Sequence, residues 1–131
     1  MSAKPVILIV DDEKNTREGL ARALRGEYAV AEAENGLRAL EWLDAHSADV
    51  VLTDLRMPGM DGLALLSRLL ARDPRPVLIL LTAYGSIETA VEAMKRGAYD
   101  FLAKPVNLDR LELLLKRALS EGRLGEENRR L

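Results

Sequence analysis

Residues 6–12 read VILIVDD, five apolar residues followed directly by two aspartates, and this stretch decides the fold. Its apolar residues do not alternate with polar ones, which is typical of a strand that helices cover on both faces of a parallel sheet. Short apolar runs recur four more times, at residues 28–33, 49–53, 77–81 and 99–103. The third and fourth of the five runs are again almost continuously apolar. We therefore predict five strands in a parallel sheet.

Segments with helical periodicity lie between these runs, and residues 60–71 form one of them. The other predicted helices start at residues that favour a helix N-terminus, namely Asn15, Asn35, Ser86 and Asn107. In the last helix, Leu108, Leu111 and Leu115 form the predicted core face. The alternation of strands and helices predicts a (βα)5 doubly wound α/β domain, because right-handed crossovers between parallel strands place helices on both faces of the sheet.

Length and composition limit the function. A chain of 131 residues suits one domain. Nineteen basic and twenty-one acidic residues give a net charge of −2, so no overall positive field favours nucleic acid or an anionic membrane. The apolar run at 6–10 is too short for a signal peptide or a membrane span. The absence of cysteine excludes disulfides and thiolate metal sites. We expect no direct binding to nucleic acid or membrane, and any charge that matters for function must be local.

Polar residues follow the predicted strands at one edge of the sheet. Asp11 and Asp12 follow the first strand, Asp54 the third, Thr82 the fourth and Lys104 the fifth. In doubly wound sheets, ligands bind outside the carboxyl ends of the strands. These side chains are therefore expected to face a common site.

The residue types at this edge indicate phosphoryl chemistry. Converging carboxylates repel one another unless a cation compensates, and Mg²⁺ binds carboxylate oxygens together with a phosphate. Lysine offers a positive charge to a phosphoryl oxygen, and threonine offers a hydroxyl donor. A carboxylate can itself accept a phosphoryl group, forming an aspartyl phosphate.

At this point the sequence resembles the receiver domain of bacterial two-component response regulators. The resemblance covers residues 5–120 and rests on four motifs: VDDE at 10–13, TDLRMPGMDG at 53–62, LTA at 81–83 and KP at 104–105. It implies the flavodoxin-like, CheY-like strand order 2-1-3-4-5. It also implies a cytoplasmic signalling protein rather than an enzyme, one that catalyses only its own phosphorylation and dephosphorylation.

The resemblance assigns the phosphoacceptor and the metal ligands. It implies that Asp54 accepts a phosphoryl group from a histidine of a sensor histidine kinase. Asp12 and Asp54 would bind Mg²⁺ directly, and Asp11 would act mainly through coordinated water. Arg56 would contribute its backbone carbonyl.

The resemblance also assigns the groups that respond to phosphorylation. Lys104 would pair with the phosphoryl group, or with Asp54 before phosphorylation. The hydroxyl of Thr82 and the backbone N–H of Ala83 would donate to phosphoryl oxygens. Phe101 matches the family's aromatic switch, where many relatives have tyrosine. The bond between Lys104 and Pro105 resembles the family's cis peptide, and Gly62 would allow a tight path after the phosphorylation loop.

Residues 82–105 are similar to the receivers of nitrogen-regulation-type activators, which couple to an ATPase domain and a DNA-binding domain and work with sigma-54 polymerase. The chain itself has no GxxxxGK[ST] run. We predict an N-terminal tail at residues 1–4 and a receiver domain at 5–120. The glycines and charges of residues 121–131 fit a frayed helix end or solvated tail as well as a linker. We favour the start of a linker to an output domain absent from this chain.

Leu113, Leu114 and Leu119 add apolar surface to the last helix beyond its predicted core face. This surface suggests a partner face, and a role in the core alone fits it equally well. We expect a phosphorylation-dependent homodimer formed by the helix after residue 86, the strand at 99–103 and the last helix.

Two other functions fit parts of this pattern. A stand-alone receiver that acts by docking to a partner fits if the natural chain ends at Leu131. A Mg²⁺-dependent phosphatase with an aspartyl-phosphate intermediate usually carries Asp-x-Asp after the first strand and a substrate cap. Here the acceptor follows the third strand, which disfavours that reading.

Overall fold

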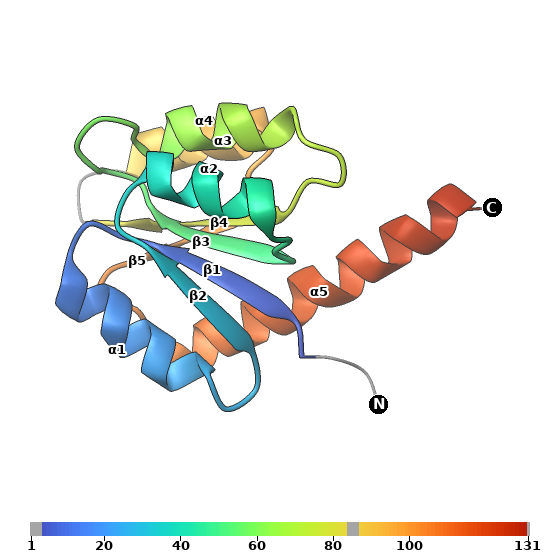
Figure 1. Ribbon diagram of the computed structural model, residues 1–131, viewed down its shortest axis with the longest axis horizontal. Helices are drawn as coiled ribbons and strands as arrows, with labels where there is room; N and C mark the ends of the chain where they lie inside the picture. Colours follow the sequence, from blue (N-terminus) through green and yellow to red (C-terminus); the bar gives the residue numbers. More distant parts are fainter. Residues whose placement is uncertain (1–3, 84–86, 131) are drawn as a thin grey trace.

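The chain forms a five-stranded parallel sheet with helices on both faces (Figure 1). This computed structural model describes residues 4–83 and 87–130, and side chains up to residue 121. The strands are β1 (Val6–Val10), β2 (Ala29–Ala33), β3 (Val50–Asp54), β4 (Val77–Thr82) and β5 (Asp100–Ala103). The helices are α1 (Lys14–Leu24), α2 (Gly36–Ala45), α3 (Gly62–Leu70), α4 (Ile87–Arg96) and α5 (Leu108–Arg130). The predicted (βα)5 organisation is confirmed.

The strand order is β2-β1-β3-β4-β5, as predicted, and all neighbouring strands pair in parallel. From β1 the chain first adds β2 on one side and then β3 on the other. The winding therefore reverses between β1 and β3, which is where doubly wound sheets bind ligands. Val10 of β1 pairs with Thr53 of β3, so the residues that follow them emerge side by side.

Alternating residues of the strands pack into two hydrophobic layers. Along β1, Ile7 and Ile9 pack with α1 and α5, whereas Leu8 and Val10 pack with α2, α3 and α4. All four side chains are fully buried. Burying one such side chain stabilises the fold by about 1.5–3 kcal/mol. The continuous apolar run at residues 6–10 therefore reflects a strand covered on both faces.

Two predicted helix starts are confirmed by side-chain caps. The side chain of Asn35 accepts a hydrogen bond from the backbone N–H of Arg38 at 2.8 Å. The side chain of Asn107 accepts one from the N–H of Arg110 at 3.2 Å. Both bonds satisfy an N–H that the first turn of a helix leaves unpaired. Ser86 lies outside the described residues.

The predicted start of α1 at Asn15 is wrong. The helix begins at Lys14, and Glu13 is its N-cap. The Glu13 carboxylate accepts from the N–H groups of Asn15 and Thr16 and from the Thr16 hydroxyl. Glutamate is not among the favoured N-cap residues, and here its longer side chain folds back onto the first turn.

The phase of α5 also differs from expectation. Leu108 was predicted to be core but is 44% exposed, whereas Leu114 is buried with Leu111 and Leu115. The helical backbone runs on to Arg130, through the segment predicted to begin a linker, and Figure 1 shows it projecting past the sheet. Within the described part of the chain, no helix has both the length and the apolar character needed to cross a bilayer.

Candidate functional site

The carboxyl ends of β1 and β3 bring three aspartates together. Val10 of β1 pairs with Thr53 of β3, so the next residues of the two strands, Asp11 and Asp54, lie side by side. Asp11, Asp12 and Asp54 each offer a carboxylate oxygen, and these oxygens lie within 4.8 Å of one another. The structure thus places these three predicted site residues in one cluster.

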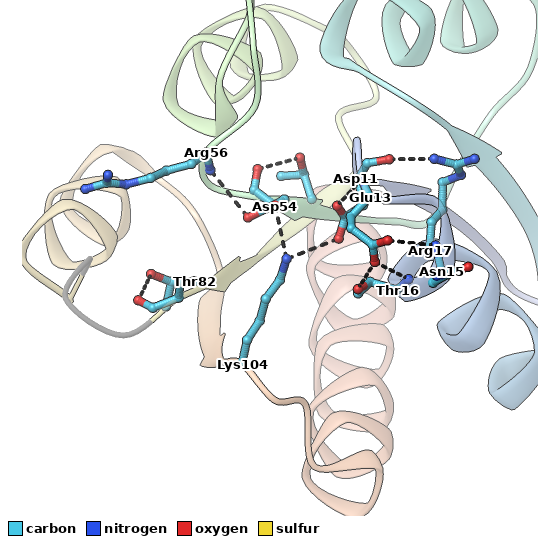
Figure 2. A network of polar contacts seen from close by, with 11 residues as sticks. Asp11, Glu13, Asn15, Thr16, Arg17, Asp54, Arg56, Thr82 and Lys104 are labelled. Atoms are coloured by element: carbon cyan, nitrogen blue, oxygen red, sulfur yellow. Dashed lines mark hydrogen bonds and ion pairs between the residues drawn. The ribbon is translucent and has the colours of Figure 1, made fainter.

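Lys104 contacts two of these carboxylates (Figure 2). Its Nζ donates to Oδ2 of Asp54 at 3.0 Å and to Oδ2 of Asp11 at 3.3 Å. The backbone N–H of Lys104 donates to the Thr82 carbonyl at 2.8 Å, which fixes the residue at the end of β5. The Lys104–Pro105 peptide bond is cis. Pairing with Asp54 was expected, whereas the contact with Asp11 was not.

The buried charges perturb each other's titration. Burial raises the pKa of Asp11, whose side chain is fully inaccessible, although the Glu13 N–H and Lys104 both oppose that rise. Burial acts to lower the pKa of Lys104, but its contacts with Asp54 and Asp11 outweigh this and raise it. Three carboxylates face one ammonium, so the cluster favours an additional cation.

Asp54 ends β3, and 13% of its side chain remains exposed. The backbone N–H of Arg56 donates to Oδ1 of Asp54 over a long 3.4 Å, and Figure 2 shows the Arg56 side chain directed away from the carboxylate. The loop after Asp54 turns back tightly, with the Gly62 N–H donating to the Leu55 carbonyl at 2.8 Å. A Cβ on Gly62 would lie 2.9 Å from the Leu55 Cα and 3.0 Å from the Asp54 carbonyl oxygen, so this approach requires glycine.

Thr82 ends β4, whereas Phe101 lies within β5, opposite Leu80. Thr82 is buried at the end of β4, and its hydroxyl donates to the Ala83 carbonyl at 3.2 Å. Figure 2 shows this group set apart from the bond between Lys104 and Asp54. Ala83, which follows Thr82, is exposed. Phe101 of β5 is partly buried and packs against the layer formed with α2, α3 and α4.

The donor set suits a hard divalent cation. Asp11 presents a buried carboxylate and Asp12 an exposed one, so the cluster combines a desolvated anion with access from solvent. Mg²⁺ takes oxygen ligands, retains several waters and uses one or two carboxylates. The residues present therefore fit Mg²⁺, and the carboxylates of Asp11, Asp12 and Asp54 would hold it.

Arg17 and Glu32 belong to the surroundings of the site and were not predicted. Arg17 Nη1 donates to the Asp11 carbonyl at 2.8 Å, and Arg17 Nε donates to Glu32 Oε1 at 3.2 Å. Glu32 lies on β2 and Arg17 on α1, so this pair joins two elements that pack together in the fold. No motif in the sequence links these residues.

Comparisons with known proteins agree with this geometry. Residues 7–116 match the family model described as response regulator receiver domain. The chain is 43% identical over 132 residues to the C4-dicarboxylate transport transcriptional regulatory protein DctD of Rhizobium meliloti, an alignment that covers 100% of this chain and 29% of the relative. It is 42% identical over 116 residues to the DNA-binding transcriptional regulator NtrC of Escherichia coli, covering 88% and 25%.

A solved structure gives the same result. The crystal structure of NtrX from Brucella abortus in complex with ADP superposes with a TM-score of 0.89 at 36% identity, covering 95% of this chain and 29% of that one. The chain thus spans less than a third of these longer relatives. Because the family model matches most of the chain, and the fold and the acidic edge agree with it, this protein belongs to the response regulator receiver domain family.

Proposed function

We propose that this receiver is a phosphorylation-dependent switch that accepts a phosphoryl group on Asp54 from a sensor histidine kinase. The observation that carries the proposal is the position of the Asp54 carboxylate, 3.0 Å from the Lys104 ammonium and beside the carboxylates of Asp11 and Asp12. A carboxylate, an ammonium and two further carboxylates thus meet at one point, which is the set of groups that this transfer would need.

Asp12 and Asp54 would bind Mg²⁺ directly, with Asp11 acting through water and Arg56 through its backbone carbonyl. The support is the excess of three carboxylates over one ammonium in the cluster. When bound, Mg²⁺ supplies positive charge that offsets the charge on the oxygens of the transferring phosphoryl group.

In the transfer, a carboxylate oxygen of Asp54 attacks the phosphorus of a phosphohistidine. The new oxygen–phosphorus bond forms as the phosphorus–nitrogen bond breaks, and the electron pair of that bond stays on the imidazole nitrogen. Lys104, already within 3.0 Å of Asp54, would pair with a phosphoryl oxygen and hold it in place. The product is an aspartyl phosphate.

The switch would run through Thr82 and Phe101. The Thr82 hydroxyl now donates to a neutral acceptor, the Ala83 carbonyl. A phosphoryl oxygen is a stronger, charge-assisted acceptor, so phosphorylation would draw the hydroxyl inward together with the Ala83 N–H. Phe101 would then turn into the vacated space. Moving such an equilibrium from 1:99 to 99:1 takes about 5.5 kcal/mol.

The output would be transcriptional and of the sigma-54 activator type. Support comes from DctD and NtrC, whose names mark them as transcriptional regulators and which extend well beyond the aligned receiver. We propose that residues 5–120 form the receiver and that residues 121–131 begin the linker to such an output domain. The helical backbone of α5 through Arg130 is compatible with a continuous connection.

A homodimer would form through the α4–β5–α5 face. Exposed apolar side chains lie on both helices of this face: Ile87, Val91, Leu108 and Leu113. Between β5 and α5 lies a hollow of about 190 Å³ lined by Asp100, Arg110 and Arg117 among others, so both charge signs are present for a self-complementary contact. Phe101 also lines this hollow, which would couple the switch to the surface.

Sedimentation with and without beryllofluoride, a phosphoryl mimic, tests the dimer. We expect the dimer fraction to rise with the mimic. A chain that stays monomeric at high concentration in both conditions would contradict the proposed dimer.

Intact mass spectrometry tests the phosphoryl switch itself. After incubation with acetyl phosphate and Mg²⁺, we expect one phosphoryl adduct on the wild type, none on Asp54→Asn, and little on the wild type with a chelator. An adduct of equal yield on Asp54→Asn would refute the acceptor assignment. Steady release of phosphate from unrelated phosphoesters would instead favour a phosphatase.

A further inference from the structure

Arg17 joins the edge of the sheet to the loop that carries the acidic cluster. Its side chain is only 14% exposed. Nη1 donates to the carbonyl oxygen of Asp11 at 2.8 Å, a contact visible in Figure 2, while Nε donates to Glu32 at 3.2 Å. One guanidinium therefore bridges a backbone carbonyl and a carboxylate, which its planar fork of donors allows.

Glu32 holds this guanidinium from the neighbouring strand. Its Oε1 pairs with Arg17, and its Oε2 pairs with Arg25 at 3.1 Å. Arg25 is 55% exposed, so the partly buried pair with Arg17 is the better shielded of the two contacts. Because Glu32 balances the charge of Arg17, this arginine acts on the acidic cluster mainly through its hydrogen bond.

The carbonyl that Arg17 binds belongs to the peptide between Asp11 and Asp12. The other polar groups of Asp11 are also engaged: its N–H donates to Ala33, Oδ1 accepts from the Glu13 N–H, and Oδ2 accepts from Lys104. The orientation of this one peptide plane sets the directions in which the first two carboxylates of the cluster leave the backbone. Arg17 is the side chain that fixes its carbonyl end.

We infer that Arg17, held by Glu32, is a positioning residue for the divalent cation site. It raises the affinity for Mg²⁺ by fixing the peptide between Asp11 and Asp12, and it contacts neither the ion nor the phosphoryl group. The inference rests on the proposed function insofar as the cation binds at these carboxylates. Partners in the outer shell of metal sites typically change affinity by about 10–100-fold.

Calorimetric titration with MgCl₂ of four proteins tests the inference: wild type, Arg17→Gln, Arg17→Lys and Arg25→Gln. We expect the Mg²⁺ affinity of Arg17→Gln to fall about tenfold. The Mg²⁺ affinity of Arg17→Lys should fall too, because an ammonium lacks the planar set of donors that contacts both the Asp11 carbonyl and Glu32. Arg25→Gln is the matched control, since it removes the exposed partner of the same glutamate, and its affinity should stay within about twofold of wild type.

A second measurement separates positioning from a general structural role. In phosphorylation by acetyl phosphate, the Mg²⁺ concentration giving half the maximal rate should rise for Arg17→Gln, while the rate at saturating Mg²⁺ stays near wild type. Thermal unfolding without Mg²⁺ shows whether each variant is folded. If Arg17→Gln does not fold, the Mg²⁺ affinity of Arg17→Lys tests the inference instead. Wild-type Mg²⁺ affinity in both Arg17 variants, or an equal loss in Arg25→Gln, would overturn the inference. A wild type that binds no Mg²⁺ would overturn the proposed metal site itself.

Discussion

The ammonium nitrogen of Lys104 lies 3.0 Å from Oδ2 of Asp54, although 50 positions separate the two residues in the chain. Lys104 follows β5 and Asp54 ends β3, and these strands are not neighbours, because β4 lies between them. The lysine side chain therefore reaches across the carboxyl end of β4 to the acidic cluster. This reach places a cation where a phosphoryl group on Asp54 would carry its charge.

Replacing Lys104 with methionine should slow phosphorylation of Asp54. The substitution keeps an unbranched side chain but removes the charge that would stabilise the transferring phosphoryl group. Loss of one such preorganised donor costs roughly 100-fold in rate. Phosphorylation kinetics with acetyl phosphate at saturating Mg²⁺ measure the effect.

Lys14→Met is the matched control, because Lys14 is an exposed lysine near the same end of the sheet. Its Nζ lies 3.9 Å from Oε1 of Glu18. Its phosphorylation rate should equal that of wild type. If both methionine variants react at the wild-type rate, Lys104 has no part in the transfer.

A second pair of variants tests the close backbone approach at Gly62. A Cβ at this position would lie 2.9 Å from the Leu55 Cα, which is backbone and cannot rotate away. Gly62→Ala should lower the free energy of unfolding by about 1–3 kcal/mol, as overpacking does. Gly19→Ala, in a helix with nothing within 4 Å of the added Cβ, should raise it by about 0.5–1 kcal/mol. Urea unfolding gives both values, and equal signs for the two variants would contradict the packing argument.

The raised pKa of Tyr99 should make the fold lose stability at alkaline pH. Burial raises its pKa from 10.0 to about 12, with Glu121 contributing. Between these values the unfolded chain releases the phenolic proton and the folded chain keeps it, so the free energy of unfolding falls as the pH rises. Tyr99→Phe removes this contribution.

The check is urea unfolding of wild type and Tyr99→Phe just below pH 10 and near pH 12. The wild type should lose more stability between the two conditions than the variant does. Parallel losses would show that Tyr99 titrates alike in both states. The comparison with the variant cancels the contributions of other alkaline groups, Lys104 among them.

The strands and the acidic edge were predictable because each signal is local. A continuous apolar run such as residues 6–10 marks a strand buried on both faces, and the residue at its end must lie at the rim of the sheet. Asp11, Asp54 and Lys104 could be assigned to one edge for that reason. Asn35 and Asn107 were recognised as caps because their short side chains favour that position.

The features missed depend on contacts that local patterns do not contain. Residues 111–115 read LELLL, so several rotations of the helix about its axis would bring leucines to the sheet. Only packing against the sheet decides that Leu114 is buried and Leu108 exposed. Glu13 caps α1 with a longer side chain than caps usually have. The pair of Arg17 with Glu32 joins α1 to β2 and appears only once the tertiary fold brings the two elements together.

Locating the phosphoryl group in the sequence tests the central claim most directly. Borohydride reduces an aspartyl phosphate to homoserine, so peptide mass spectrometry after reaction with acetyl phosphate and Mg²⁺ identifies the acceptor. We predict homoserine at position 54 and unmodified aspartate at positions 11 and 12. Homoserine at Asp11 or Asp12 with Asp54 unchanged, or phosphoryl groups on other residue types, would contradict the account.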